Sequence, residues 1–139
     1  MKTLYAVLVI AVIFSALSFN GCSGSKEQVS ITPLVGTEWR LETLNGKSIA
    51  LKSGNYITLN FSAAADKING AGVCNKYFGE FTKNGSAMKF SGIGSTKMMC
   101  DDNLNESDYF SSLGVVDAYK IAGGKLTLLS KGITVAIYK

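Results

Sequence analysis

The chain has 139 residues, a formal net charge of +4 at pH 7 and no histidine. Without histidine, Ser-His-Asp and Cys-His catalysis, His-rich zinc sites and the usual neutral-pH proton shuttle are excluded. The basic residues occur singly from Lys26 to Lys139 and form no patch, which argues against a nucleic-acid partner.

Residues 1–21 have the pattern of a bacterial lipoprotein signal peptide. Lys2 supplies a short positive region, and Leu4 to Leu17 is a continuous apolar stretch. A helix that crosses ~30 Å of hydrocarbon needs about 20 apolar residues. This stretch is shorter and small polar residues follow it at once, so a cleaved secretory signal is favoured over a retained membrane anchor.

Cys22 is the expected lipid attachment site. The segment from Ser18 to Cys22 is similar to a bacterial lipobox, although Phe19 and Asn20 stand where Leu and a small residue are usual. Lipidation would supply the two acyl chains that stable anchoring takes. The alternative is ordinary cleavage after Ser18, which would leave Cys22 as a free thiol near the N-terminus of a secreted protein.

The part after the signal divides into two. Residues 22–33 are polar and lack an apolar pattern, so we expect a flexible tether. Residues 34–139 have the length of one domain and show no repeat. Ser23 follows the cysteine, which favours sorting to the outer membrane of a Gram-negative bacterium.

Short strands separated by turns are expected through the first half of the domain. Residues 37–44 alternate, with Trp39 and Leu41 on one face, and Asn45-Gly46 is a strong hairpin turn signal. Further strands are expected over residues 56–61, 67–72, 77–82 and 87–90, with turns at Asn84-Gly85 and at residues 92–97.

One helix should follow. Asn103, with Glu106 three residues later, resembles a capping box, and Gly114 is a plausible end. Leu104, Tyr109, Phe110 and Leu113 give it a modest apolar stripe, and strands are expected over 118–121, 125–129 and 133–138. These elements predict a β-rich α+β fold: an antiparallel curled sheet of seven or eight strands, or a small barrel, whose open end or face the helix covers.

Several local patterns have structural explanations. Gly70-Ala71-Gly72 lacks the third glycine of a dinucleotide fingerprint and is expected to bend a strand. Acidic residues at the helix start are better explained by their favourable interaction with the helix dipole than by a calcium site. Aromatic side chains are expected in the core, with a ligand cavity as the alternative; they are Tyr77, Phe78, Phe81, Phe90, Tyr109 and Phe110.

Four segments together identify a family resemblance. They are residues 36–47 (GTEWRLETLNGK), 69–80 (NGAGVCNKYFGE), 96–100 (TKMMC) and 104–106 (LNE). They resemble the META domain, the family of the HslJ-like heat-shock lipoproteins, over about residues 34–139. The resemblance implies a compact barrel-like β fold with one helix. It also implies links to heat shock, envelope stress and novobiocin resistance, without an established catalytic reaction.

Cys74 and Cys100 fall in the two most specific blocks of this resemblance, whose exported members often carry both cysteines. The resemblance therefore implies a disulfide, and an exported chain with two cysteines in its domain is expected to pair them. A redox-active pair is an alternative, though such pairs more often have CxxC spacing. A metal site is another, but only Asp101 and Asp102 stand near as further ligands. We expect no metal.

These observations favour a non-enzymatic envelope lipoprotein that acts under envelope or heat stress, and in resistance to novobiocin-type antibiotics. It would act through contacts with the membrane, which the Cys22 lipid supplies, or with an envelope protein. The alternative is a small barrel that binds a lipid or small hydrophobic ligand, as a pilotin-like chaperone. We expect no cofactor. An enzyme is disfavoured because nothing in the sequence is arranged to activate a Ser, Tyr or acidic side chain.

Overall fold

Residues 31–139 are described by the computed structural model, so the predicted signal peptide, Cys22 and most of the predicted tether lie outside the described residues. The described part contains nine strands and one helix. They are β1 (Trp39–Leu44), β2 (Lys47–Ser48), β3 (Thr58–Ser62), β4 (Lys67–Ala71), β5 (Lys76–Asn84), β6 (Ala87–Ser95), α1 (Glu106–Gly114), β7 (Ala118–Ala122), β8 (Lys125–Ser130) and β9 (Ile133–Tyr138).

The strands form one curled antiparallel sheet in the order β2-β1-β3-β4-β5-β6-β7-β8-β9. β1 also pairs with β9, which closes the sheet into a ring. The predicted class, a curled antiparallel sheet with a single helix, is confirmed. The two-residue strand β2 is an addition that the sequence pattern does not reveal.

Alternating burial builds the sheet. In β5, Tyr77, Gly79 and Phe81 are buried while their neighbours are exposed, as period-two patterning requires. The hairpin turns match the sequence signals: Asn45 and Gly46 both have positive φ values, 48° and 76°, the conformation of a tight hairpin turn.

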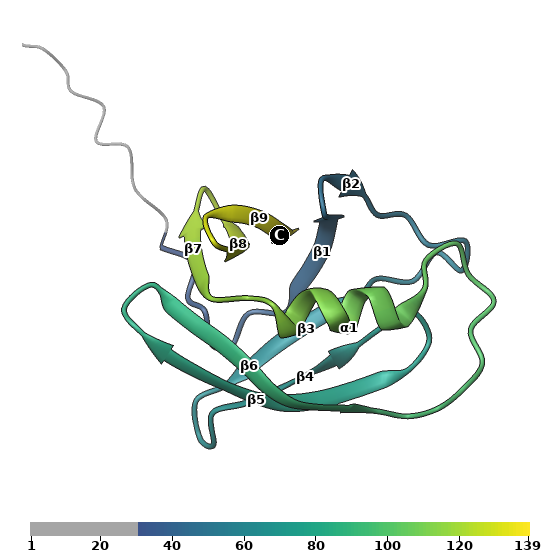
Figure 1. Ribbon diagram of the computed structural model, residues 1–139, viewed down its shortest axis with the longest axis horizontal. Coiled ribbons are helices and arrows are strands. Elements are labelled where there is room, and N and C mark those ends of the chain that lie inside the picture. The colour runs from purple at the N-terminus through teal and green to yellow at the C-terminus, as the bar shows by residue number, and fades with distance from the viewer. Residues whose placement is uncertain (1–30) are drawn as a thin grey trace, which may run out of the picture.

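The ring has one weak seam, between β6 and β7. These strands share the single pair Ala87–Ala118, whereas β7 pairs with β8 over its whole length. The helix α1 connects β6 to β7 and lies between the β4–β6 strands and the β7–β9 strands (Figure 1). Its Tyr109 and Leu113 are fully buried in the common core. The helix therefore packs where strand pairing is thinnest.

Two local predictions were wrong. β6 continues through Ser95, so residues 92–95 form strand rather than turn. Gly92 has a φ of +60° next to a register shift, and a Cβ on Gly94 would lie 2.9 Å from the Phe78 ring. These glycines serve a bulge and a close ring contact.

The helix begins later than predicted, because Asn105 and not Asn103 is the N-cap. Asn105 has extended backbone angles, and its side chain accepts a hydrogen bond from Ser107 N. Asn103 instead donates its side-chain amide to Ala50 O at 2.9 Å. Glu106 is therefore the first helical residue, and its carboxylate is directed elsewhere. Within residues 31–139, no helix combines the length and apolar character that a membrane crossing requires.

Candidate functional site

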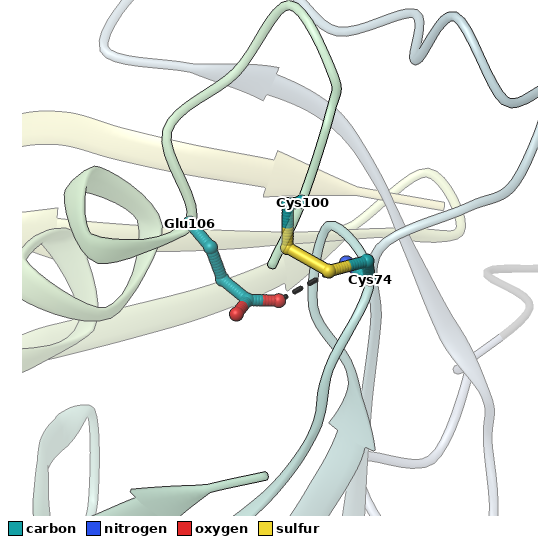
Figure 2. Close-up of side chains that lie close together, drawn as sticks. All are labelled: Cys74, Cys100 and Glu106. Atoms are coloured by element: carbon teal, nitrogen blue, oxygen red, sulfur yellow. Dashed lines mark hydrogen bonds between the residues drawn. A yellow bond between two sulfur atoms is a disulfide. The ribbon is translucent and has the colours of Figure 1, made fainter. Parts of the chain in front are cut away.

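The structure brings Cys74 and Cys100 together as a disulfide (Figure 2). Cys74 lies between β4 and β5, and Cys100 lies in the connection from β6 to α1. Their Cα atoms are 5.6 Å apart and their sequence separation is 26 residues. The predicted pair is thus placed side by side, and the bond would fasten the β4–β5 turn to the segment that enters the helix.

Asn75 forms the centre of a hydrogen-bond network around this disulfide. Its side chain is nearly buried, with 4% relative exposure. Oδ1 accepts hydrogen bonds from Thr96 Oγ1 and from Met98 N, both at 2.7 Å. Nδ2 donates to Met98 O at 3.0 Å and to Glu106 Oε2 at 2.6 Å. These four bonds use the two lone pairs and both protons of the amide, so its orientation is fixed.

Glu106 completes the network from the start of α1. Its Oε1 accepts from Cys74 N at 3.1 Å, the bond drawn in Figure 2, and from Asn75 N at 2.9 Å. A Cβ on Gly72 would overlap this oxygen, so only glycine leaves room for the carboxylate. We call the set Gly72, Cys74, Asn75, Met98, Cys100 and Glu106 the clasp.

Glu106 was expected to cap the helix or interact with its dipole, and its role in the clasp was not foreseen. The residue lies 31 positions from Asn75, and no local sequence signal joins the two. The other acidic residues do not converge with it. Asp102 accepts hydrogen bonds from the amides of Lys52, Ser53 and Asn103. Burial raises the pKa of Asp102, but these amide bonds outweigh that effect and lower its pKa overall.

Metal binding is the first chemistry to test at the clasp. Ligand atoms of Cys74, Cys100 and Glu106 all lie within 4.8 Å of one another. Cysteine binds a metal as the thiolate, and sulfurs joined in a disulfide are not thiolates. The carboxylate already accepts three N–H bonds. The donor set in this form does not fit a metal ion.

The polar side chains of the clasp are engaged in hydrogen bonds. Among the described residues, no buried side-chain nitrogen or oxygen is without a hydrogen-bond partner. Each polar atom of Asn75 and Glu106 is directed at another member of the network or at Thr96. The hydrogen bonds join the β4–β5 turn, the β6–α1 connection and the start of α1, so the arrangement has a structural role.

A second buried network consists of three tyrosine hydroxyls. Tyr109 Oη lies 2.9 Å from Tyr77 Oη and 3.2 Å from Tyr138 Oη, and Tyr77 donates to Thr58 O at 2.8 Å. Burial raises the pKa of all three phenols above the ordinary range. They therefore stay neutral at physiological pH and link β3, β5, α1 and β9. The sequence predicted buried aromatic residues but not this hydroxyl chain.

The predicted aromatic core is largely confirmed. Tyr77, Phe81, Phe90 and Tyr109 are buried and Phe110 is half-buried. Phe78 was wrongly included, because its side chain is 63% exposed on the outer face of β5. Trp39, Tyr109 and Tyr138 fill the centre of the ring with no exposed surface.

Among several open grooves on the surface, two lie beside the clasp and beside residues 31–34. One, of about 300 Å³, runs beside the clasp and is lined by residues 71–76, Arg40 and Tyr56. The Arg40 guanidinium lies 5.1 Å from the Tyr56 ring centroid and pairs with Glu38 at 3.0 Å. The other, of about 490 Å³, lies between residues 31–34 and the edge of β7.

The fold and the clasp together define a small ring-shaped β domain with one covering helix and a disulfide at the helix entrance. The META domain family model matches residues 32–139, and the chain belongs to this family. The predicted family is confirmed.

Solved structures support the same fold. An NMR structure of a protein from Burkholderia xenovorans is 22% identical with a TM-score of 0.61, covering 76% of this chain and 82% of that chain. A second NMR structure is 27% identical with a TM-score of 0.57, covering 73% of this chain and 86% of that chain. The search of curated proteins found no match.

Proposed function

We propose that this protein is a lipid-anchored envelope lipoprotein whose META domain acts by contact with other envelope components rather than by catalysis. One observation carries the proposal: in the most specific family segments, the side chains of Asn75 and Glu106 are fully engaged in hydrogen bonds to one another and to backbone groups. The surface that they hold in place is then the functional part.

The anchor belongs to the same proposal. Cys22 would carry two acyl chains, residues 23–33 would form the tether, and the protein would reside in the outer membrane of a Gram-negative bacterium. Contact with an envelope partner would support survival under heat or envelope stress and resistance to novobiocin-type antibiotics. The family resemblance supports this finer role.

Complementation in a strain that lacks the protein tests this function. The wild-type chain should restore growth under heat and novobiocin and should fractionate with membranes, with the mass of a lipidated protein. Cys22→Ser should release a folded domain from the membrane and fail to complement. A Cys22→Ser variant that stays in membranes, or that complements fully after release, contradicts the anchor-dependent role.

The pilotin-like alternative requires space for a hydrophobic ligand. The described core is filled by Trp39, Tyr109 and Tyr138, so a ligand would have to bind in an open surface groove, the larger of which measure about 490 and 530 Å³. Native mass spectrometry of protein extracted from membranes distinguishes the two functions. A stoichiometric lipid bound besides the covalent anchor would favour the carrier.

A further inference from the structure

Three large apolar side chains are exposed on β5 and on the segment that follows β6, beside the clasp. Phe78 is 63% exposed, Met98 61% and Met99 fully exposed. Phe78 on β5 pairs with Gly94 on β6. Further along the same pair of segments, Thr96 N donates a hydrogen bond to Lys76 O at 3.0 Å. The β5 strand and the segment carrying the methionines are therefore neighbours. We call Phe78, Met98 and Met99 the methionine patch.

The clasp holds this patch outward. Asn75 bonds both the N–H and the C=O of Met98, and Cys100 is joined to Cys74. Met99 is thus fixed between two tied residues and has no route into the core, in contrast to Met88, which is 1% exposed. Rigidly displayed apolar side chains are typical of binding surfaces, and methionine adapts readily to a partner's shape.

The rim of the patch is basic. Lys76 and Lys97 are both exposed, and neither forms an ion pair within residues 31–139. Asp101 is exposed nearby, whereas Asp102 is engaged by backbone amides. A surface with an apolar centre and a positive rim is complementary to an apolar cleft edged by carboxylates.

The patch lies far from the point where the tether enters. Ser86, at the other end of β6, lines the same groove as Ile31. The nine residues of β6 separate that groove from Thr96, a distance of about 30 Å at ~3.3 Å per residue. Figure 1 shows the β6–α1 connection at the end of the molecule opposite the described N-terminal residues. A domain tethered at Ile31 can therefore direct the patch away from its own membrane.

We propose that the methionine patch is the docking surface for a protein partner that presents an apolar cleft edged by Asp or Glu side chains. This inference rests on the contact function proposed above and names the surface that performs it. Met98, Met99 and Phe78 would fill the cleft, and Lys76 and Lys97 would face its acidic rim.

Site-specific photocrosslinking in intact cells tests the proposal. A photoreactive amino acid replaces Met99 in the full-length chain, and a matched probe replaces Ile133, which is 72% exposed elsewhere on the domain. We expect a protein crosslink from position 99 that is absent from position 133. Mass spectrometry of the crosslinked peptide should map it to apolar residues beside Asp or Glu. Met98→Ser should lower the yield by roughly tenfold.

A charge exchange provides the decisive control. Lys97→Glu should lower the crosslink yield, and replacing the mapped acidic residue of the partner by Lys should restore it. Crosslinks only to lipid, only to a second copy of this chain, or equally from both positions overturn the proposal, as does failure of the exchange. If Cys22→Ser abolishes membrane attachment and complementation but crosslinking persists, docking stands. If that variant complements while crosslinking persists, only the anchored function fails.

Discussion

Glu106→Gln is the sharpest test of the clasp, because it changes charge and hydrogen-bonding sense with almost no change in shape. Glutamine can keep an oxygen near the amides of Cys74 and Asn75. Its NH2 group must then face Asn75 Nδ2, which lies 2.6 Å from the present oxygen. Asn75 cannot turn over, since its Oδ1 holds Thr96 Oγ1 and Met98 N.

The cost follows from these contacts. Two donors left facing each other in a half-buried site cost about 1–3 kcal/mol. The two backbone amides lose a charged acceptor, and bonds to charged groups exceed neutral ones by ~1 kcal/mol each. Because the site is partly exposed, we expect about 2–3 kcal/mol in total. For a domain of this size, that lowers the melting temperature by roughly 10 °C.

Thermal unfolding followed by circular dichroism, without reductant, measures the effect. Two matched variants separate the clasp from general loss of charge. Asp108→Asn removes another first-turn acidic residue and should cost at most ~1 kcal/mol through the helix dipole. Glu80→Gln breaks the solvent-exposed pair with Lys67 and should lower the melting temperature much less than Glu106→Gln does. A Glu106→Gln shift no larger than that of Asp108→Asn would refute the reasoning.

Three further predictions use the same structure. Gly72→Ala should displace the Glu106 carboxylate and lower the stability of the domain as much as Glu106→Gln does. The double variant should lose little more stability than either single variant. Gly114→Ala, whose added Cβ would meet nothing within 4 Å, is the control in the same thermal unfolding experiments. Thiol titration of denatured, unreduced protein should find no thiol at Cys74 or Cys100, and replacing both by Ser should cost ~3.5 kcal/mol in urea unfolding, from the entropy of the 26-residue loop; two titratable thiols would show that the pair is unbonded. Because burial raises the pKa of Tyr109 and Tyr138, the folded state holds their protons more tightly than the unfolded state, so stability present below about pH 10 should fall as the pH rises further. Urea unfolding from pH 8 to 11 measures that slope, and an unchanged slope in Tyr138→Phe would contradict it.

Local sequence patterns predicted most of the fold because strands and hairpins are local. Alternation placed Trp39 and Leu41 inward, and Asn45-Gly46 gave the first turn. Closure of the ring could not be read in the same way. β1 and β9 pair across almost the whole chain, and the Glu42 contacts with Lys125 and Lys139 that accompany closure depend on it.

Only those residues of the site whose type has a distinctive chemistry, the two cysteines, could be predicted from the sequence. Two cysteines in a domain that is predicted to be exported are expected to pair, so the Cys74–Cys100 disulfide was predicted. Asn75 and Glu106 are common residues whose partners lie 21–32 positions away, and nothing local selects them. The choice between Asn103 and Asn105 as helix cap failed for a related reason. Both residues suit an N-cap, and the Asn103 contact with Ala50 decides between them.

The clasp also explains how the ring stays closed across its thinnest pairing. β6 and β7 share one residue pair, so backbone hydrogen bonds alone hold that seam weakly. The chain leaves β6 at Ser95, is tied to the β4–β5 turn by Asn75, Cys74 and Glu106, and only then forms α1. The helix starts from a fixed point and buries Tyr109 and Leu113 before it delivers the chain to β7. The clasp therefore has two effects: it stabilises the β6–β7 boundary through the position of α1, and it holds Met98 and Met99 at the surface.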